Sequence, residues 1–186
     1  MYEFKTEPYQ HQQLAYENSW QTPAYALFME MGTGKTKVAI DTMGTLFTEG
    51  KINTALIIAP KGVYSNWVNK EIPQHLSDQV KVDLLLWQPN QTQKFKKRLT
   101  EVARGTDNSV LRILVMNTEA LSTQKGTKVA QRFLEINPDN FVVVDESTSI
   151  KNRNAQRTKN IVKLGKVAKY KRILTGSPIT KTPMDL

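Results

Sequence analysis

Short apolar runs alternate with longer amphipathic stretches along almost the whole chain, and this alternation leaves few possible folds. The runs are rich in valine, isoleucine and leucine with little polar alternation, as in strands buried on both faces. We predict strands at Ala24–Met29, Thr54–Ala59, Val82–Trp87, Leu111–Met116, Phe141–Asp145 and Arg172–Thr175. We predict helices at Gln12–Trp20, Lys35–Phe47, Tyr64–Glu71 (ending before Pro73), Thr92–Ala103, Val129–Leu134 and Ala155–Leu164.

Strands that alternate with helices indicate an α/β fold, in which right-handed crossovers build a mainly parallel sheet with helices on both faces. In such sheets ligands bind beyond the carboxyl ends of the strands. Residues that follow a strand directly are therefore the first candidates for function.

The composition describes one ordinary globular domain. The chain has 186 residues, of which 39% are hydrophobic and 23% charged. It has no cysteine and only two histidines, His11 and His75, so disulfides and thiolate or histidine-rich metal sites are excluded. No apolar run approaches the roughly 20 residues that cross a bilayer, and no secretory signal is visible at the start. We expect an intracellular protein with no membrane partner.

The chain carries a formal net charge of +9. Such an excess favours polyanionic partners, because lysine and arginine displace counterions from a phosphate backbone. Solubility alone explains many basic proteins, so charge leaves nucleic-acid binding open.

A glycine-containing loop follows the first predicted strand and leads directly into a helical pattern. This order of strand, loop, Lys-Thr and helix is the context of a P-loop, whose backbone N–H groups close around phosphates. Lys35 can reach the β- and γ-phosphates of ATP, and the Thr36 hydroxyl can ligate Mg²⁺. Met29 stands where the motif has its first glycine. The predicted loop residues are Met31, Gly32, Thr33, Gly34, Lys35 and Thr36.

Two carboxylates, Asp145 and Glu146, end the fifth predicted strand. An enzyme that transfers phosphoryl groups needs one carboxylate for the Mg²⁺ shell and another group to orient the attacking water. Adjacent residues at a strand end point in different directions, so they can divide these tasks. We assign Asp145 to the metal and Glu146 to the water.

The sixth predicted strand ends in Thr175, Gly176, Ser177 and Pro178. Hydroxyls at this strand end could sense the γ-phosphate beside the acidic pair. The same four residues also make a favourable turn, and this reading remains open.

Taken together, the motifs resemble those of the superfamily 2 helicases, specifically the Swi/Snf-type translocases. The resemblance spans Pro8 to Pro178. It is carried by the phosphate loop as motif I, by Ala59-Pro60 with Asn66-Trp67 as motif Ia, by the acidic box that begins at Asp145 as motif II, and by Leu174–Pro178 as motif III.

The resemblance implies a RecA-like first domain, ATP with Mg²⁺, and movement along nucleic acid, with duplex DNA favoured. It implies that Gln12 reads the adenine edge, since an amide can donate and accept at once; Gln10 is the rival. It also implies coupling through Thr148, Thr175 and Ser177. The implied nucleic-acid contacts are Lys61, Ser65, Asn66, Thr118, Lys151 and Arg153. Trp67 could stack on a base, but a tryptophan in an amphipathic helix is more often core.

Two departures from the family pattern stand out. Thr148 replaces the usual histidine of the acidic box, which leaves its link to Thr175 and Ser177 open. The family also continues into a second RecA-like domain that brings arginine fingers, and this sequence stops before it. A DNA-dependent ATPase motor domain is therefore the leading hypothesis. A nucleotide-gated nucleic-acid-binding module with little hydrolysis of its own is the alternative.

Overall fold

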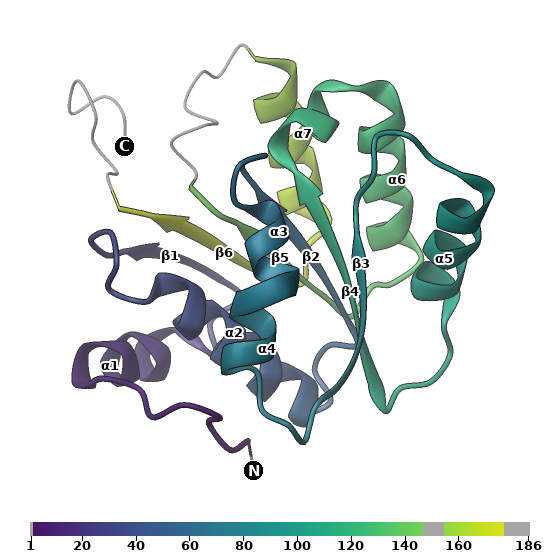
Figure 1. Cartoon of the computed structure of the whole chain (residues 1–186). Helices are drawn as coiled ribbons and strands as arrows, with labels where there is room; N and C mark the ends of the chain where they lie inside the picture. Colours follow the sequence, from purple (N-terminus) through teal and green to yellow (C-terminus); the bar gives the residue numbers. More distant parts are fainter. Residues whose placement is uncertain (1, 147–154, 177–186) are drawn as a thin grey trace.

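A computed structural model describes residues 2–146 and 155–176 of the chain (Figure 1). Its centre is a six-stranded parallel sheet in the order β1-β6-β5-β2-β4-β3. The predicted strands are confirmed, with ends within two residues of those expected. They are β1 (Ala24–Phe28), β2 (Thr54–Ala59), β3 (Lys81–Leu86), β4 (Val110–Asn117), β5 (Asn140–Val144) and β6 (Tyr170–Thr175).

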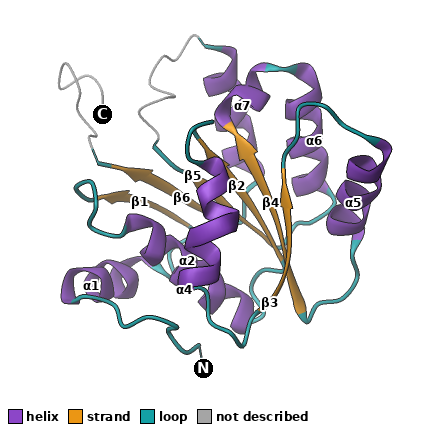
Figure 2. Cartoon of the chain, viewed as in Figure 1, coloured by secondary structure: helices purple, strands orange, loops and turns teal. Residues whose placement is uncertain are grey.

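Helices cover both faces of the sheet, as the alternating pattern predicts (Figure 2). One face carries α1 (Gln10–Ser19), α2 (Lys35–Thr48), α3 (Tyr64–Asn66) and α4 (Ile72–His75). The other carries α5 (Gln93–Arg104), α6 (Gln124–Glu135) and α7 (Gln156–Val167). None of the described helices is both long enough and apolar enough to span a membrane.

The two faces have separate hydrophobic cores because successive side chains of a strand point to opposite sides. On β2, Ala55 and Ile57 join the core under α2, whereas Leu56 and Ile58 join the core under α5, α6 and α7. All residues of β2 and β5 are buried. These central strands therefore hold their carboxyl ends in fixed positions.

Two helix predictions are wrong in their limits. The helix predicted at Tyr64–Glu71 does not end before Pro73. It passes through a π-helical turn at Trp67–Glu71 into α4, where proline occupies the first turn and its missing N–H costs no helical bond. Helix α6 starts at Gln124, not Val129, because the Thr123 hydroxyl caps it by accepting the Gly126 N–H at 3.0 Å. The polar first turn of α6 carries no apolar periodicity.

The N-terminal segment is fastened to α2 by a buried polar cluster. The Lys37 Nζ lies 2.6 Å from Asp41 Oδ2, and both side chains are at most 5% exposed. The Tyr2 hydroxyl donates to Asp41 Oδ1 at 3.3 Å and accepts the Ser77 N–H at 3.3 Å. A Cβ atom at Gly44 would lie 2.3 Å from the Tyr2 ring, so glycine allows this close approach. These contacts fix α2, whose first turn borders the site.

Helix α1 is tied to β6 by a fully buried arginine. Arg172 donates to the carbonyl oxygen of Ser19 at 2.6 Å and, through its other terminal nitrogen, to that of Lys171 at 2.8 Å. A cation at the carboxyl end of a helix also offsets the helix dipole. Burial lowers the pKa of Arg172 to about 10, which leaves the guanidinium charged at neutral pH. The contact fixes α1 against the sheet.

Candidate functional site

The loop between β1 and α2 has the backbone conformation of a phosphate cradle. Gly32 and Gly34 adopt φ values of 78° and 86°, which only glycine takes up without strain. The Thr33 hydroxyl donates to the Glu30 carbonyl oxygen at 2.7 Å and closes the loop. Gly34 leads into the 14-residue helix α2, whose first N–H groups have no side-chain cap. A glycine loop that leads into the start of a helix favours an anion there, through free backbone N–H groups and the helix dipole.

Lys35 is 7% exposed and lies against this loop. Its Nζ donates to the carbonyl oxygens of Met29 at 3.0 Å and Glu30 at 2.8 Å. A phosphate oxygen forms a shorter, charge-assisted bond with an ammonium group than a neutral carbonyl does. The lysine is thus held at the loop by partners that an anionic ligand can replace.

Of the two candidate glutamines, Gln12 is the one that contacts the loop. It is 6% exposed, its Oε1 accepts the Tyr9 N–H at 3.0 Å, and its Nε2 donates to the Thr33 carbonyl oxygen at 3.0 Å. Gln10 is exposed. An amide has a second N–H and a second lone pair, so these bonds leave Gln12 able to meet a base edge. Its reading of adenine stays a prediction.

His11 also contacts the loop, and no sequence pattern predicts this contact. A ring nitrogen of His11 lies 2.9 Å from the same Thr33 carbonyl oxygen that Gln12 binds. Consecutive side chains at the start of α1 therefore meet one loop carbonyl. The helix start buttresses the loop.

The acidic pair lies where β5 ends, beside the loop. The Asp145 N–H donates to the Ile58 carbonyl oxygen at 2.8 Å, which continues the pairing with β2. Asp145 Oδ1 accepts the Glu146 N–H at 2.9 Å. Burial raises the pKa of Asp145, and the like charge of Glu146 adds to the rise, while a hydrogen bond from Trp67 and the charge of Lys35 oppose it.

Glu146 is the only non-glycine residue among the described ones with a positive φ, 47°. This left-handed conformation costs an ordinary residue about 1–2 kcal/mol. Such strain is concentrated at functional sites, where the surrounding structure imposes it.

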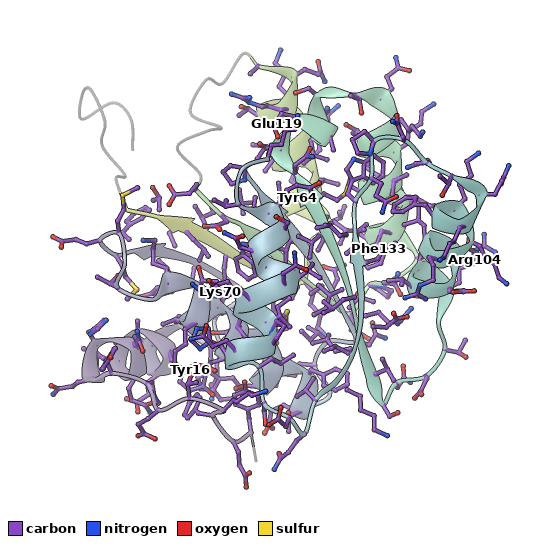
Figure 3. All side chains as sticks on the ribbon, in the orientation of Figure 1. Tyr16, Tyr64, Lys70, Arg104, Glu119 and Phe133 are labelled. Atoms are coloured by element: carbon purple, nitrogen blue, oxygen red, sulfur yellow. The ribbon has the colours of Figure 1, made fainter. Side chains whose placement is uncertain are left out.

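Loop, lysine and acidic pair border one open cleft of about 510 Å³. Its lining includes the phosphate-loop residues, the start of α2, and the segment from α3 to α4. Lys70, labelled in Figure 3, lies on that segment. Among the described residues no three His, Asp or Glu side chains gather as a metal site. A metal ion here would depend on the Thr36 hydroxyl, the Asp145 carboxylate, water and the ligand. The cleft residues are Met31, Gly32, Gly34, Lys35, Thr36, Lys37, Val63, Asn66, Trp67, Lys70, Glu71, His75, Asp145 and Glu146.

The end of β6 lies under the phosphate loop. A Cβ atom at Gly176 would lie 3.1 Å from Met31 Cγ, so the loop and this turn are in close contact. Thr175 is 2% exposed. Thr148 and Ser177, the other predicted coupling residues, lie outside the described residues, as do Lys151 and Arg153. Their predicted roles stay predictions.

The predicted nucleic-acid contacts are only partly placed on the surface. Lys61 and Asn66 are exposed and Ser65 is half-buried, all at the carboxyl end of β2. Thr118 departs from the prediction: it is 1% exposed and its hydroxyl donates to Glu119 at 3.3 Å. It opens the helical turn Thr118–Ser122, which Asn117 caps by accepting the Ala120 N–H at 2.7 Å. Figure 3 labels the exposed Glu119 that follows.

Trp67 is 2% exposed, which confirms the core position and excludes base stacking in this conformation. Its indole Nε1 donates to Asp145 Oδ2 at 2.9 Å. This contact is not predictable from sequence spacing, because 78 positions separate the two residues. The only available signal was that both belong to motifs of one site.

The comparisons with known proteins agree with this geometry. The family model described as SNF2-related domain matches residues 9–186. Among curated relatives, the SWI/SNF-related matrix-associated actin-dependent regulator of chromatin subfamily A containing DEAD/H box 1 of Xenopus tropicalis is 27% identical over 157 residues, covering 84% of this chain and 14% of that protein. The human Helicase-like transcription factor is 28% identical over 169 residues, covering 88% of this chain and 16% of that protein.

Solved structures show the same fold. The Sulfolobus solfataricus SWI2/SNF2 ATPase core in complex with dsDNA has a TM-score of 0.70 at 20% identity, over 99% of this chain and 35% of that chain. The UvsW helicase from bacteriophage T4 has a TM-score of 0.62 at 14% identity, over 92% of this chain and 53% of that chain. The predicted RecA-like α/β fold is confirmed. The chain spans about one-seventh of the length of the Xenopus relative.

Proposed function

The chain belongs to the SNF2-related domain family, and from that premise we propose that residues 1–186 are the ATP-binding domain of a DNA-dependent ATPase that couples hydrolysis to movement along DNA. The observation that carries the proposal is the single cleft in which the phosphate loop faces the acidic pair. Phosphoryl transfer in P-loop ATPases needs both groups at one ligand, because the loop holds the phosphates and a carboxylate holds the Mg²⁺ bound to them.

In this proposal the loop amides and Lys35 bind the phosphates of ATP. The Thr36 hydroxyl and the Asp145 carboxylate fit Mg²⁺, which takes hard oxygen ligands and keeps several of its waters. When bound, Mg²⁺ neutralises charge that develops on the phosphate oxygens. The hydrogen bond from Gln12 to the Thr33 carbonyl oxygen holds the backbone N–H groups of the loop in place.

Glu146 orients the attacking water in this proposal. Adjacent residues at a strand end point in different directions, so its side chain and that of Asp145 can serve different atoms. Thr175 is the buried last residue of β6. In this proposal it couples the γ-phosphate to the rest of the domain, together with Thr148 and Ser177.

Duplex DNA is the proposed track, since the similar Sulfolobus core was solved in complex with dsDNA. Lys61, Ser65 and Asn66 would contact its backbone from the carboxyl end of β2. Contacts by Lys151 and Arg153 are part of the same proposal. Such contacts position the protein without reading sequence. The net charge of +9 makes this binding strongly salt-dependent.

A second RecA-like domain is proposed as the partner that completes the site. No described arginine lines the cleft, and an arginine supplied from outside raises the rate of related ATPases by about 10³–10⁵. The same observation favours the second candidate for residues 1–186 alone: a nucleotide-gated module that binds DNA weakly and hydrolyses ATP slowly.

ATP turnover by the full-length protein tests the proposal, measured without polymer and with duplex DNA, single-stranded DNA or RNA. We expect duplex DNA to stimulate turnover, and Glu146→Gln to bind ATP at the parental affinity while hydrolysing it poorly. Parental turnover in Glu146→Gln would remove the catalytic assignment. Equal rates with and without every polymer would favour a nucleotide-gated module over a motor.

A further inference from the structure

A buried hydrogen bond joins two motifs that the proposed function treats separately. Trp67, in the segment after β2, donates its indole N–H to Asp145 at the end of β5, with 2.9 Å between Nε1 and Oδ2. Trp67 is 2% exposed and Asp145 9% exposed. The bond is thus shielded from water. In the protein interior a charge-assisted hydrogen bond is stronger than at the surface.

The bond fixes the rotation of the Asp145 carboxylate. Oδ1 accepts the Glu146 N–H, and Oδ2 accepts the Trp67 indole N–H. A carboxylate with one hydrogen bond can still turn about its side-chain bonds, whereas one bond from the next residue and one from the segment after β2 together define its plane. Each oxygen keeps a second lone pair. Those lone pairs remain for a ligand on the cleft side.

The backbone around Trp67 is adapted to this contact. Trp67 opens the π-helical turn, in which the Ile72 N–H donates to the Trp67 carbonyl oxygen five residues back. Such turns are rare and occur frequently at functional sites. The extra residue in the turn changes the direction of the side chains that precede it. Tyr64 and Lys70, labelled in Figure 3, lie on either side of Trp67 along this segment.

The same short segment carries surface residues of the predicted DNA track. Asn66 is exposed and directly precedes Trp67, and Lys61 and Ser65 lie just before it. The Val63 and Tyr64 N–H groups both donate to the Pro60 carbonyl oxygen at 2.9 Å, which makes the segment compact. The exposed Asn66 and the buried Trp67 are therefore neighbours in one compact segment.

We propose that Trp67 is a positioning residue: its indole N–H holds Asp145 in the orientation that ligates Mg²⁺, and it links the DNA-facing segment after β2 to the metal. The inference rests on the proposed function, because it takes Asp145 as the metal ligand. It adds that the ligand is oriented from the segment on the nucleic-acid side.

Trp67→Phe tests the inference, because it removes the donor and keeps an aromatic ring in the core. Calorimetry compares the affinity for ATP with Mg²⁺ and for ATP with EDTA, in the parent chain and in the variant. Loss of a residue that orients a metal ligand typically costs about 10–100-fold in metal affinity. Mg²⁺ should raise the ATP affinity of the parent chain, and we expect this increase to be roughly 10-fold smaller in Trp67→Phe. The affinity for ATP in the presence of EDTA should be the same in both proteins. Trp87→Phe is the control, since Trp87 is 3% exposed in the core on the other face.

The outcomes separate the inference from the function on which it rests. A parent chain whose ATP affinity gains nothing from Mg²⁺ would overturn both. If Mg²⁺ raises the ATP affinity of the parent and of Trp67→Phe by the same factor, the inference alone would be overturned. An equal loss of affinity with Mg²⁺ and with EDTA would also overturn it, because the tryptophan would then act only through packing.

A second measurement does not depend on the folding of Trp67→Phe. The chain has three tryptophans, so its ¹⁵N–¹H spectrum holds three indole signals, assigned by Trp20→Phe and Trp87→Phe. We expect the Trp67 signal to shift more with ATP and Mg²⁺ than with ATP and EDTA. Identical spectra in the two conditions, with ATP bound in both, would contradict the inference.

Discussion

The left-handed backbone of Glu146 leads to a test in which two variants that both lack the carboxylate should differ in stability and not in activity. At φ 47° a side chain with a Cβ costs about 1–2 kcal/mol that glycine avoids. Glycine also gives the unfolded chain more freedom, which costs about 0.4–1 kcal/mol relative to alanine. We therefore expect Glu146→Gly to be more stable than Glu146→Ala by about 1 kcal/mol, while neither hydrolyses ATP efficiently.

Comparison of glycine with alanine isolates the backbone. Both variants remove the charge that acts on Asp145, so this effect cancels between them. Glu101 supplies the control, because it is exposed within α5. There Gly should be less stable than Ala by about 1 kcal/mol. The sign of the difference should therefore reverse between the two positions.

Urea unfolding and thermal melting of the nucleotide-free chain measure both pairs. For a domain of this size, 1 kcal/mol corresponds to about 2–4 °C in Tm. A Glu146→Gly variant less stable than Glu146→Ala, with the Glu101 pair behaving as expected, would refute the reasoning. It would mean that the positive φ is not imposed by the fold.

Three further predictions concern the loop and the segment that face each other across the cleft. Lys35→Ala should abolish or strongly weaken binding of ATP with Mg²⁺ without unfolding the domain; unchanged affinity by calorimetry would contradict the P-loop assignment. Gly34→Ala should destabilise the domain by about 2 kcal/mol, because its Cβ would lie 2.2 Å from Gln12 Nε2 and its φ is 86°. In a Gln12→Ala background the cost should shrink, and an unchanged cost in urea unfolding would exclude the clash. Burial lowers the pKa of His75 below 6.5, so the folded chain binds fewer protons than the unfolded one. The stability linked to this shift is present above about pH 6.5 and is lost as the pH falls. Tm should therefore depend less on pH in His75→Gln than in the parent chain. Equal slopes of Tm against pH in the two proteins would contradict this prediction.

The fold could be predicted from the sequence because its strands are buried on both faces. Thr54–Ala59 was predicted with the limits that β2 has, since every residue of that strand is buried and each contributes to the pattern. Helix α6 was predicted too short, because a cap and a polar first turn define its start. Pro73 misled the prediction in another way: it stops a helix interior but is tolerated in a first turn.

Local motifs revealed the parts of the site that one loop or strand end supplies. Gly32 and Gly34 have positive φ values, a conformation that glycine allows and that depends on residues only a few positions apart. Thr118 was misplaced because burial depends on what packs over a turn, and the family pattern carries no such information. The His11 contact with Thr33 was missed for the same reason. A side chain that meets a distant backbone atom leaves no periodic trace.

Trp67 shows why the proposed coupling escapes sequence reasoning although both of its partners are in recognisable motifs. A tryptophan in an amphipathic helix is correctly expected in the core, and its burial confirms this. Burial alone, however, does not state where the indole N–H points. That direction depends on the π-helical turn, which in turn accommodates the step from Glu71 to Pro73. Because the donor meets the carboxylate of Asp145 and not a backbone carbonyl, a change in this turn reaches the proposed metal ligand through one bond. Motif spacing can place both residues at one sheet edge, but only the tertiary structure shows that one orients the other.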